Sequence, residues 1–151
     1  MPASNGKPYR VGRSDTGLGL FATEPIKKRT LIIEYRGRRI SNKRAAELEW
    51  IRSNKYLFEL NSRWTIDGKA RSNIARYVNH SCKPNAEAEL IRGRMMFRAV
   101  KNIAAGAEIT IDYGEEYVDL FFAKHGCLCE PCRKGKRKKG AAKKRAKKQA
   151  K

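Results

Sequence analysis

At 151 residues with 40% hydrophobic side chains, the chain is long enough to bury a hydrophobic core, and it predicts one compact domain plus a tail. No apolar run approaches the roughly 20 residues that a membrane-spanning helix needs. Residues 1–10 also lack the apolar segment of a secretory signal. We therefore expect an intracellular protein with no membrane partner. The formal net charge is +20, and it is unevenly placed.

Most of the excess positive charge lies at the C-terminal end. Residues 133–151 hold twelve Lys or Arg and no acidic side chain, which leaves 23 basic and 15 acidic residues, a net +8, in residues 1–132. The tail has no large apolar residue, so it cannot form a packed core and is expected to be disordered when free. Its charge suits non-specific binding to nucleic acid by counterion release. A nuclear localisation signal, a substrate of the protein's own activity and a solubilising tail are alternatives.

The first half of the chain predicts short strands and one helix. Residues 9–22 are expected to form two strands around a turn at residues 14–17, where Ser, Asp and Gly favour a turn. Residues 30–35 are rich in β-branched side chains and predict a third strand. Ser41 is a good N-cap for a helix over residues 42–52, in which apolar residues recur at helical spacing.

Two hairpins are predicted further along the chain. Residues 56–60 and 64–67 are expected to form the first, around an Asn-Ser turn. Residues 86–91 and 94–100 are expected to form the second, around the Arg-Gly turn at residues 92–93. Both hairpins add to the strand content of the domain.

The remaining predicted elements are brief. Residues 72–78 are expected to form a short helical turn, and residues 108–111 a strand. Residues 115–124 predict a second helix, acidic at its start and followed by Gly126. Together the elements predict a mainly β (α+β) domain of short strands with two or three short helices.

Three short motifs stand out against this pattern. They are GLG over residues 17–19, NHSCKPN over residues 79–85 and ITIDYG over residues 109–114. Each alone has an ordinary structural interpretation: a glycine turn, a polar turn closed by proline, and a strand that ends at a glycine.

In this order and at these distances, the three motifs resemble those of the SET-domain family of protein lysine methyltransferases. The resemblance covers roughly residues 9 to 132, with further matches at IEYRG (33–37), YLF (56–58), IDG (66–68) and NIARYV (73–78). It implies a SET-domain β-clip of short sheets. It also implies a C-terminal pseudoknot, in which the segment around Asn79 is threaded by the segment around Tyr113, against the usual rule that chains do not thread loops.

The resemblance further implies an activity: transfer of a methyl group from S-adenosylmethionine to a lysine amine. The backbone of Gly17, Leu18 and Gly19 would approach the cofactor closely, because glycine has no Cβ in the way. The other residues that would contact the cofactor are Tyr35, Asn79, His80 and Tyr113. Asn79 would use its side chain and His80 largely its backbone, although His80 could instead serve only as a structural hydrogen-bonding residue.

Tyr113 matches the family's catalytic tyrosine, with an ordinary core aromatic as the alternative. Its hydroxyl would orient the lysine amine for in-line transfer. Tyr56, assigned with it to catalysis, would line the lysine channel together with Tyr113 and Ile111. A free lysine has a pKa of about 10.4, and a narrow, dry channel favours the neutral amine. The family often has Phe or Tyr in place of Ile111, and an aliphatic residue leaves room for more than one methyl unless other side chains refill the space.

The four cysteines predict a metal site, because clustered cysteines in a cytosolic chain favour a metal over disulfides. Cys127, Cys129 and Cys132 place three thiols within six residues and need a fourth ligand for tetrahedral zinc. The resemblance implies that Cys82 completes one structural Zn2+ site, which would hold a post-SET segment over the active site. Thiols without metal are the alternative, and the Cys-x-Cys-x-x-Cys spacing is shorter than the family's usual one.

We expect four parts in the chain: an N-terminal lead (1–8), the SET domain (9–117), a post-SET helix and zinc segment (118–132) and the disordered basic tail (133–151). A pre-SET segment is not expected. The substrate would be a lysine in a histone or a similar basic chromosomal protein, and the protein would be chromosome-associated. Two alternatives are a non-catalytic SET-like module tethered to DNA by its tail and a zinc-containing nucleic-acid binder.

Overall fold

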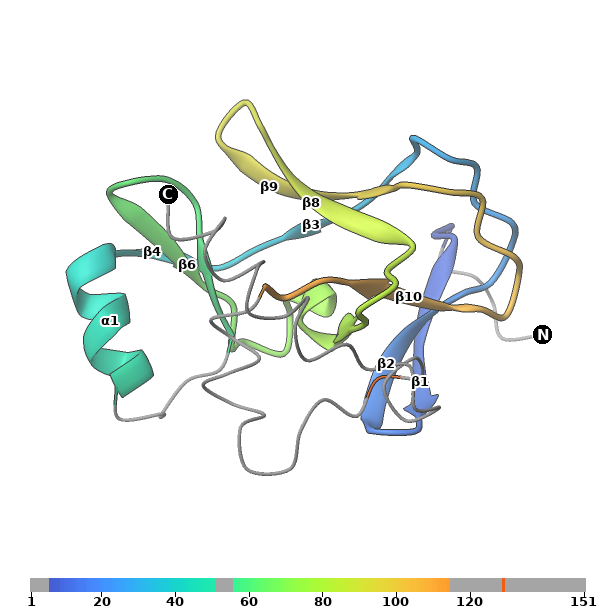
Figure 1. Ribbon diagram of the computed structural model, residues 1–151, viewed down its shortest axis with the longest axis horizontal. Helices are drawn as coiled ribbons and strands as arrows, with labels where there is room; N and C mark the ends of the chain where they lie inside the picture. Colours follow the sequence, from blue (N-terminus) through green and yellow to red (C-terminus); the bar gives the residue numbers. More distant parts are fainter. Residues whose placement is uncertain (1–5, 51–55, 115–128, 130–151) are drawn as a thin grey trace, which may run out of the picture.

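The computed structural model describes residues 6–50, 56–114 and residue 129. Within these residues the chain forms ten β-strands, one α-helix and one 3-10 helix, and the strands make three small sheets (Figure 1). This arrangement confirms the predicted mainly β fold. None of the helices in the described ranges is long and apolar enough to cross a membrane.

The first sheet joins the start of the described chain to its end, with strand order β1-β2-β10-β7. β1 (Tyr9–Ser14) and β2 (Gly17–Ala22) form the predicted hairpin. β10 (Glu108–Ile111) pairs antiparallel with β2 and parallel with β7 (Asn79–His80). Segments that are far apart in the sequence therefore lie side by side in this sheet.

The second sheet has the order β3-β9-β8 and contains the predicted second hairpin. Its strands are β3 (Leu31–Tyr35), β8 (Ala86–Ile91) and β9 (Arg94–Ala99). The two turn residues, Arg92 and Gly93, have φ angles of 50° and 80°. Positive φ at both central positions matches the right-handed twist of the paired strands, so the turn continues the ladder without splaying it.

The third sheet has the order β4-β6-β5 and contains the predicted first hairpin. Its strands are β4 (Arg38–Ser41), β5 (Leu57–Glu59) and β6 (Trp64–Asp67). Because β3 and β4 are joined by only a short connection at Gly37, the second and third sheets are neighbours (Figure 1).

Both helices lie within the ranges that the sequence predicts for them. Ser41 Oγ accepts a hydrogen bond from the backbone N–H of Arg44 at 3.1 Å, which confirms Ser41 as the N-cap of α1 (Asn42–Trp50). The predicted end of this helix, residue 52, lies outside the described residues. The 3-10 helix η1 (Ile74–Tyr77) lies inside the predicted helical turn.

Two strands were not predicted from the sequence. β4 begins with two arginines and has little apolar character, so only its pairing with β6 identifies it as a strand. β7 has two residues and is recognised only by its pairing with β10. The helix predicted over residues 115–124 lies outside the described residues.

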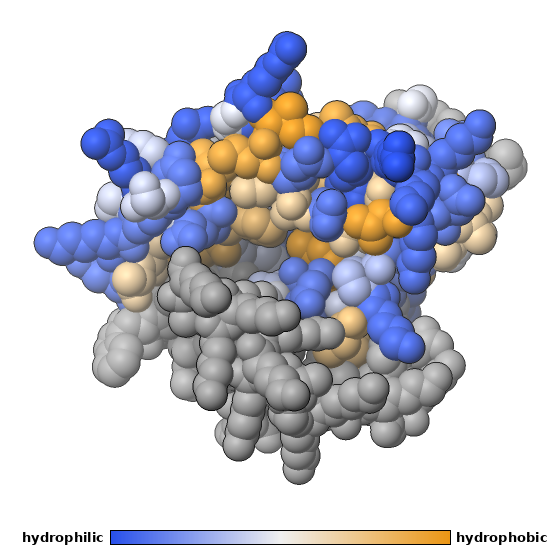
Figure 2. All heavy atoms as spheres, turned by 45° about the horizontal axis from the view of Figure 1, so that its top comes forward, coloured by the Kyte–Doolittle hydropathy of each residue, from blue (hydrophilic) through white to orange (hydrophobic). Residues whose placement is uncertain are grey.

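The hydrophobic core includes side chains from all three sheets. Its largest fully buried side chains are Phe97, Leu20, Ile109 and Val78. The rings of Tyr35, Phe58 and Phe97 lie 5.0–5.9 Å apart between centroids and join β3, β5 and β9. Figure 2 shows long hydrophilic side chains projecting around a narrow apolar strip on one face. The buried core holds β2 and β10 rigidly, and the three motifs are carried on or beside these strands.

Candidate functional site

Parallel pairing of β7 with β10 brings two of the three motifs together. Thr110 lies opposite Asn79 and Ile111 opposite His80, and Ser81 N donates a hydrogen bond to Ile111 O at 2.9 Å. β10 also pairs with β2, which carries the Gly-x-Gly motif. All three motifs therefore lie on or next to one four-stranded sheet.

The carboxamide of Asn79 connects the motifs by hydrogen bonds. Its Nδ2 lies 3.0 Å from Leu18 O, 3.2 Å from Ser14 Oγ and 2.8 Å from Glu108 Oε2. A Cβ at Gly19 would lie 2.5 Å from Glu108 Oε2 and 3.0 Å from Asn79 Nδ2. A side chain at Gly19 would therefore displace the Glu108 carboxylate from its place beside Asn79, and glycine leaves room for both groups.

Glu108 is the acidic member of this network, and sequence reasoning missed it. Burial raises the pKa of its carboxyl above the ordinary value, the hydrogen bond from Asn79 acts in the opposite direction, and the nearby charge of Asp15 raises the pKa further. The ionised carboxylate thus depends on Asn79 for stabilisation. The sequence offered one sign of this residue: a single glutamate at the start of a strand whose other residues are all β-branched.

The imidazole of His80 holds the backbone of Tyr113. Tyr113 N donates to His80 Nδ1 at 3.0 Å, and the two ring centroids lie 5.5 Å apart. The Tyr113 hydroxyl donates to the carbonyl of Val78. His80 is buried, so this contact is shielded from water. Ile111 is also buried, with 2% of its surface exposed, and belongs to the hydrophobic core.

Tyr35 and Tyr56 form a second group of predicted site residues. The Tyr35 hydroxyl donates to Tyr56 O at 2.6 Å, while the Tyr35 ring is buried in the core. The guanidinium of Arg76 stacks on the Tyr56 ring at 4.2 Å from its centroid. Arg76 Nε is buried and has no hydrogen-bond acceptor within the described residues. A buried donor of this kind is costly unless a ligand or another part of the chain supplies an acceptor.

The two groups meet at η1. Arg76, which covers Tyr56, lies in η1, and Val78, which accepts the Tyr113 hydroxyl, is the residue directly after it. The structure places Tyr35 beside Tyr56 rather than in the Asn79 network. Its role toward a cofactor stays a prediction, as do the roles of the other predicted site residues.

Comparison with known proteins identifies the family. The family model of the SET domain matches residues 17–114 of this chain. The chain belongs to the SET-domain family. The matched range of this SET domain begins at the Gly-x-Gly motif and ends at the glycine after Tyr113.

Several histone-lysine methyltransferases are similar to this SET domain. The chain is 35% identical over 133 residues to a "Histone-lysine N-methyltransferase, H3 lysine-4 specific" of Eremothecium gossypii, covering 82% of this chain and 14% of the relative. It is 35% identical over 111 residues to human "Histone-lysine N-methyltransferase 2D", covering 68% of this chain and 2% of the relative. The chain thus spans a small part of the length of these relatives.

A solved structure is similar in fold. It is a humanized mutant of the Chaetomium thermophilum Polycomb Repressive Complex 2, with a TM-score of 0.62 and 31% sequence identity. The match covers 76% of this chain and 16% of the chain in that structure. The shared fold agrees with the family assignment.

Three side chains of types that can bind a metal ion converge beside the motif on β7. One ligand atom each from His80, Cys82 and Cys129 lies within 4.8 Å of the others. Cys82 N donates to Cys129 Sγ at 3.5 Å, and His80 Nε2 lies 3.3 Å from Cys82 Sγ. Cys127 and Cys132 lie outside the described residues. Two of the four predicted zinc ligands are therefore brought together, from segments distant in the sequence.

The hydrogen bonds of His80 decide its part in this cluster. Because Nδ1 accepts the N–H of Tyr113, Nδ1 carries no proton, and a neutral imidazole must carry its proton on Nε2. A protonated Nε2 cannot bind a metal, but it can donate to the sulfur of Cys82. His80 therefore fits as a hydrogen-bond donor to a ligand rather than as a ligand, and such donors orient ligands in metal sites.

Proposed function

We propose that this SET domain is a protein-lysine N-methyltransferase. It transfers a methyl group from S-adenosylmethionine to a lysine amine, in a histone or another basic chromosomal protein. The observation that carries the proposal is that Asn79 is hydrogen-bonded to Leu18 in the Gly-x-Gly motif, while His80 is hydrogen-bonded to Tyr113 in the third motif. The similarity to relatives named as histone-lysine methyltransferases supports the reaction and the substrate class.

The described residues offer suitable contacts for S-adenosylmethionine. Gly17 and Leu18 are exposed at the start of β2, while Gly19 is buried behind them, and the absence of a side chain on Gly17 permits close approach of a ligand. Arg76 supplies a half-buried cation whose buried Nε lacks an acceptor within the described residues. The cofactor carries a carboxylate on its methionine part, which is a suitable partner for a guanidinium. Asn79 and His80 complete the proposed cofactor site.

When bound, S-adenosylmethionine supplies an electrophilic methyl group on a sulfonium. The work left to the protein is to hold a neutral lysine amine in line with that methyl and to keep water out. The Tyr113 hydroxyl is held in place by Val78 O, and the Tyr113 backbone by His80. We assign the orientation of the amine to this hydroxyl, and the walls of the lysine channel to Tyr56, Ile111 and Tyr113.

We propose one structural zinc ion bound by Cys82, Cys127, Cys129 and Cys132. The convergence of Cys82 and Cys129, with hydrogen-bond donors aimed at both sulfurs, supports this ligand set. Thiolates bind zinc as a closed tetrahedral site, which stabilises the local fold outright. The zinc would join residues 118–132, the proposed post-SET segment, to the motif on β7 beside His80.

We further propose that residues 133–151 bind nucleic acid without sequence preference. Their twelve cationic side chains and lack of acidic ones support this role. Such a tail would keep the enzyme chromosome-associated and close to histone substrates. It would follow an N-terminal lead (1–8), the SET domain (9–117) and the zinc segment.

A methyl-transfer assay tests the proposal directly. The purified chain is mixed with labelled S-adenosylmethionine, with and without mixed histones, and modified residues are mapped by mass spectrometry. The expected product is methyl-lysine that disappears with Tyr113→Phe. Cofactor binding without transfer to any histone would refute the substrate class. Absence of both binding and transfer would favour the non-catalytic module.

A further inference from the structure

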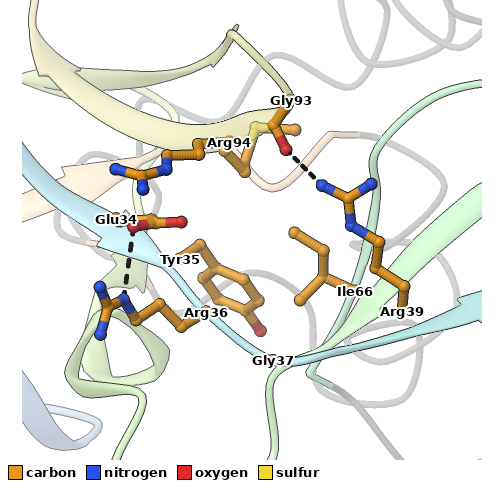
Figure 3. A pocket seen from close by; sticks show the side chains of 9 residues that line it. Glu34, Tyr35, Arg36, Gly37, Arg39, Ile66, Gly93 and Arg94 are labelled. Carbon is orange, nitrogen blue, oxygen red and sulfur yellow. Dashed lines mark hydrogen bonds and ion pairs between the residues drawn. The ribbon is translucent and has the colours of Figure 1, made fainter.

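A pocket of about 280 Å³ lies between the second and third sheets. Its floor is apolar and buried, formed by Tyr35, Ile66 and Met95, each 5% exposed. Three arginines and one glutamate surround this floor, as Figure 3 shows. The arginines and the glutamate have no assigned part in the proposed methyl transfer, whereas Tyr35 is a predicted cofactor contact and its hydroxyl donates to Tyr56 O.

The charge of the pocket is strongly positive. Arg36, Arg39 and Arg94 face a single carboxylate, that of Glu34. Glu34 pairs with Arg36 at 3.3 Å, an ion pair that is largely exposed on the arginine side. Among the ion pairs within the described ranges, none involves Arg39 or Arg94. At least two guanidinium charges therefore remain available to an anion.

Arg39 makes one hydrogen bond that orders its side chain at the pocket. Its Nη2 donates to Gly93 O at 2.7 Å, which joins β4 to the β8–β9 turn across the pocket (Figure 3). Gly93 has a φ of 80°, so this carbonyl is presented by a turn that suits glycine. One hydrogen bond uses one of the five N–H donors of a guanidinium. An ordered side chain also loses less entropy on binding than a mobile one.

The placement of these residues follows from the chain's path between sheets. β3 ends at Tyr35 and β4 begins at Arg38, so Arg36 and Arg39 reach the same pocket from both sides of the connection. Gly37 permits this tight passage, because a Cβ there would lie 2.1 Å from the carbonyl oxygen of Asp67. The tight passage at Gly37 therefore brings Arg36 and Arg39 to one pocket, where both side chains are exposed.

We propose that this arginine pocket binds a backbone phosphate of nucleic acid. All three of its cations are arginines, whose planar forks match phosphate oxygens in bidentate geometry. The rest of the chain carries charge of the same sign, including the basic tail, so one polyanion can engage both. When the tail and the pocket bind the same nucleic acid, the phosphate contact at the pocket raises the overall affinity by avidity. The idea that this binding takes place on chromatin rests on the proposed function, but the binding of nucleic acid by the pocket does not.

The test uses the full chain, a labelled random-sequence DNA duplex and no methyl donor. Fluorescence anisotropy gives the dissociation constant over a series of salt concentrations. The double variant Arg39→Gln with Arg94→Gln should reduce the salt slope by roughly 0.9, since the pocket contacts one phosphate and each lost phosphate contact removes about 0.9.

The matched control is Arg44→Gln with Arg63→Gln, which removes the same charge. Both residues are exposed and lie beyond Ser41 and Trp64, the opposite end of the β4–β6 ladder from Arg38. The control pair should leave the slope within about 0.5 of the parent, because diffuse surface charge adds little beyond a Debye length. Equal slopes for the two double variants would overturn the proposal.

A second measurement locates the contact without interference from the tail. Phenylglyoxal modifies accessible guanidinium groups, and mass spectrometry reports the sites. Bound duplex should protect Arg39 and Arg94 and leave Arg44 and Arg63 reactive. Protection by poly-glutamate but not by DNA would overturn the proposal in favour of an acidic protein partner. Because no methyl transfer is measured, failure of the proposed enzyme activity would leave both results intact.

Discussion

Replacement of Asn79 by alanine tests the network that joins the three motifs. The change removes a donor to Glu108 Oε2 at 2.8 Å and donors to Leu18 O and Ser14 Oγ at 3.0 and 3.2 Å. A bond to a carboxylate contributes about 1.5–3 kcal/mol and a neutral bond about 0.5–1.5 kcal/mol. Since one amide has two hydrogens and part of the network is exposed, we expect a loss of about 2–3 kcal/mol in unfolding free energy.

The loss should depend on pH because Glu108 titrates. Burial already raises the pKa of Glu108, and the Asn79 hydrogen bond is the influence that lowers it. Removing Asn79 should therefore raise the pKa of the folded state further. The loss of unfolding free energy caused by Asn79→Ala has its full value at neutral pH, where the Glu108 carboxylate is ionised. It becomes smaller as the pH falls through the raised Glu108 pKa of the folded variant.

Urea unfolding followed by tryptophan fluorescence measures this difference. Parent and Asn79→Ala chains are compared at neutral pH and near pH 4.5, the ordinary pKa of a glutamate such as Glu108. Because both chains carry the same other carboxyl groups, the effects of those groups cancel in the difference between the two unfolding free energies. In a Glu108→Gln background, the loss caused by Asn79→Ala should be about 1 kcal/mol smaller and independent of pH. An equal loss at both pH values in the parent background would refute the reasoning.

Three further predictions concern the proposed catalytic residue, the proposed zinc site and the basic tail. Tyr113→Phe should lower turnover about a hundredfold while the dissociation constant for S-adenosylmethionine, measured by calorimetry, changes by less than about threefold; unchanged turnover contradicts the catalytic assignment. Cys129→Ser should release the zinc, so metal analysis of the purified chain should find far less than in the parent, and equal zinc content would rule out this ligand. Deletion of residues 133–151 should weaken DNA binding and flatten its salt dependence while methylation of short peptides continues, and an unchanged slope argues against the tail.

Much of the local structure could be predicted from the sequence. Alternation, β-branched content and turn residues depend on neighbours a few positions apart, and they located the hairpins at β1–β2 and β8–β9. Ser41 was recognised as a cap because its hydrogen bond reaches only three residues along the chain. The family motifs were visible for the same reason, since each is a short, contiguous run.

The candidate site could be predicted only in part. Asn79, His80 and Tyr113 were named from motifs, and the structure places them together. Glu108 and Arg76 were missed, because an isolated charged residue gives no sign of burial until the partners around it are known. Their surroundings come from strands and helices far away in the sequence.

The sequence by itself determined the class of fold, the family and the uneven charge of the chain. The family resemblance implied that the segments of β7 and β10 meet and that Cys82 approaches Cys129. Only the tertiary structure decided the parallel register of β7 with β10 and the bond from Arg39 to Gly93 across two sheets. The physical reason is that pairing between distant segments is selected by burial of the shared core. That selection depends on the whole chain at once and leaves no periodic signal in any one segment.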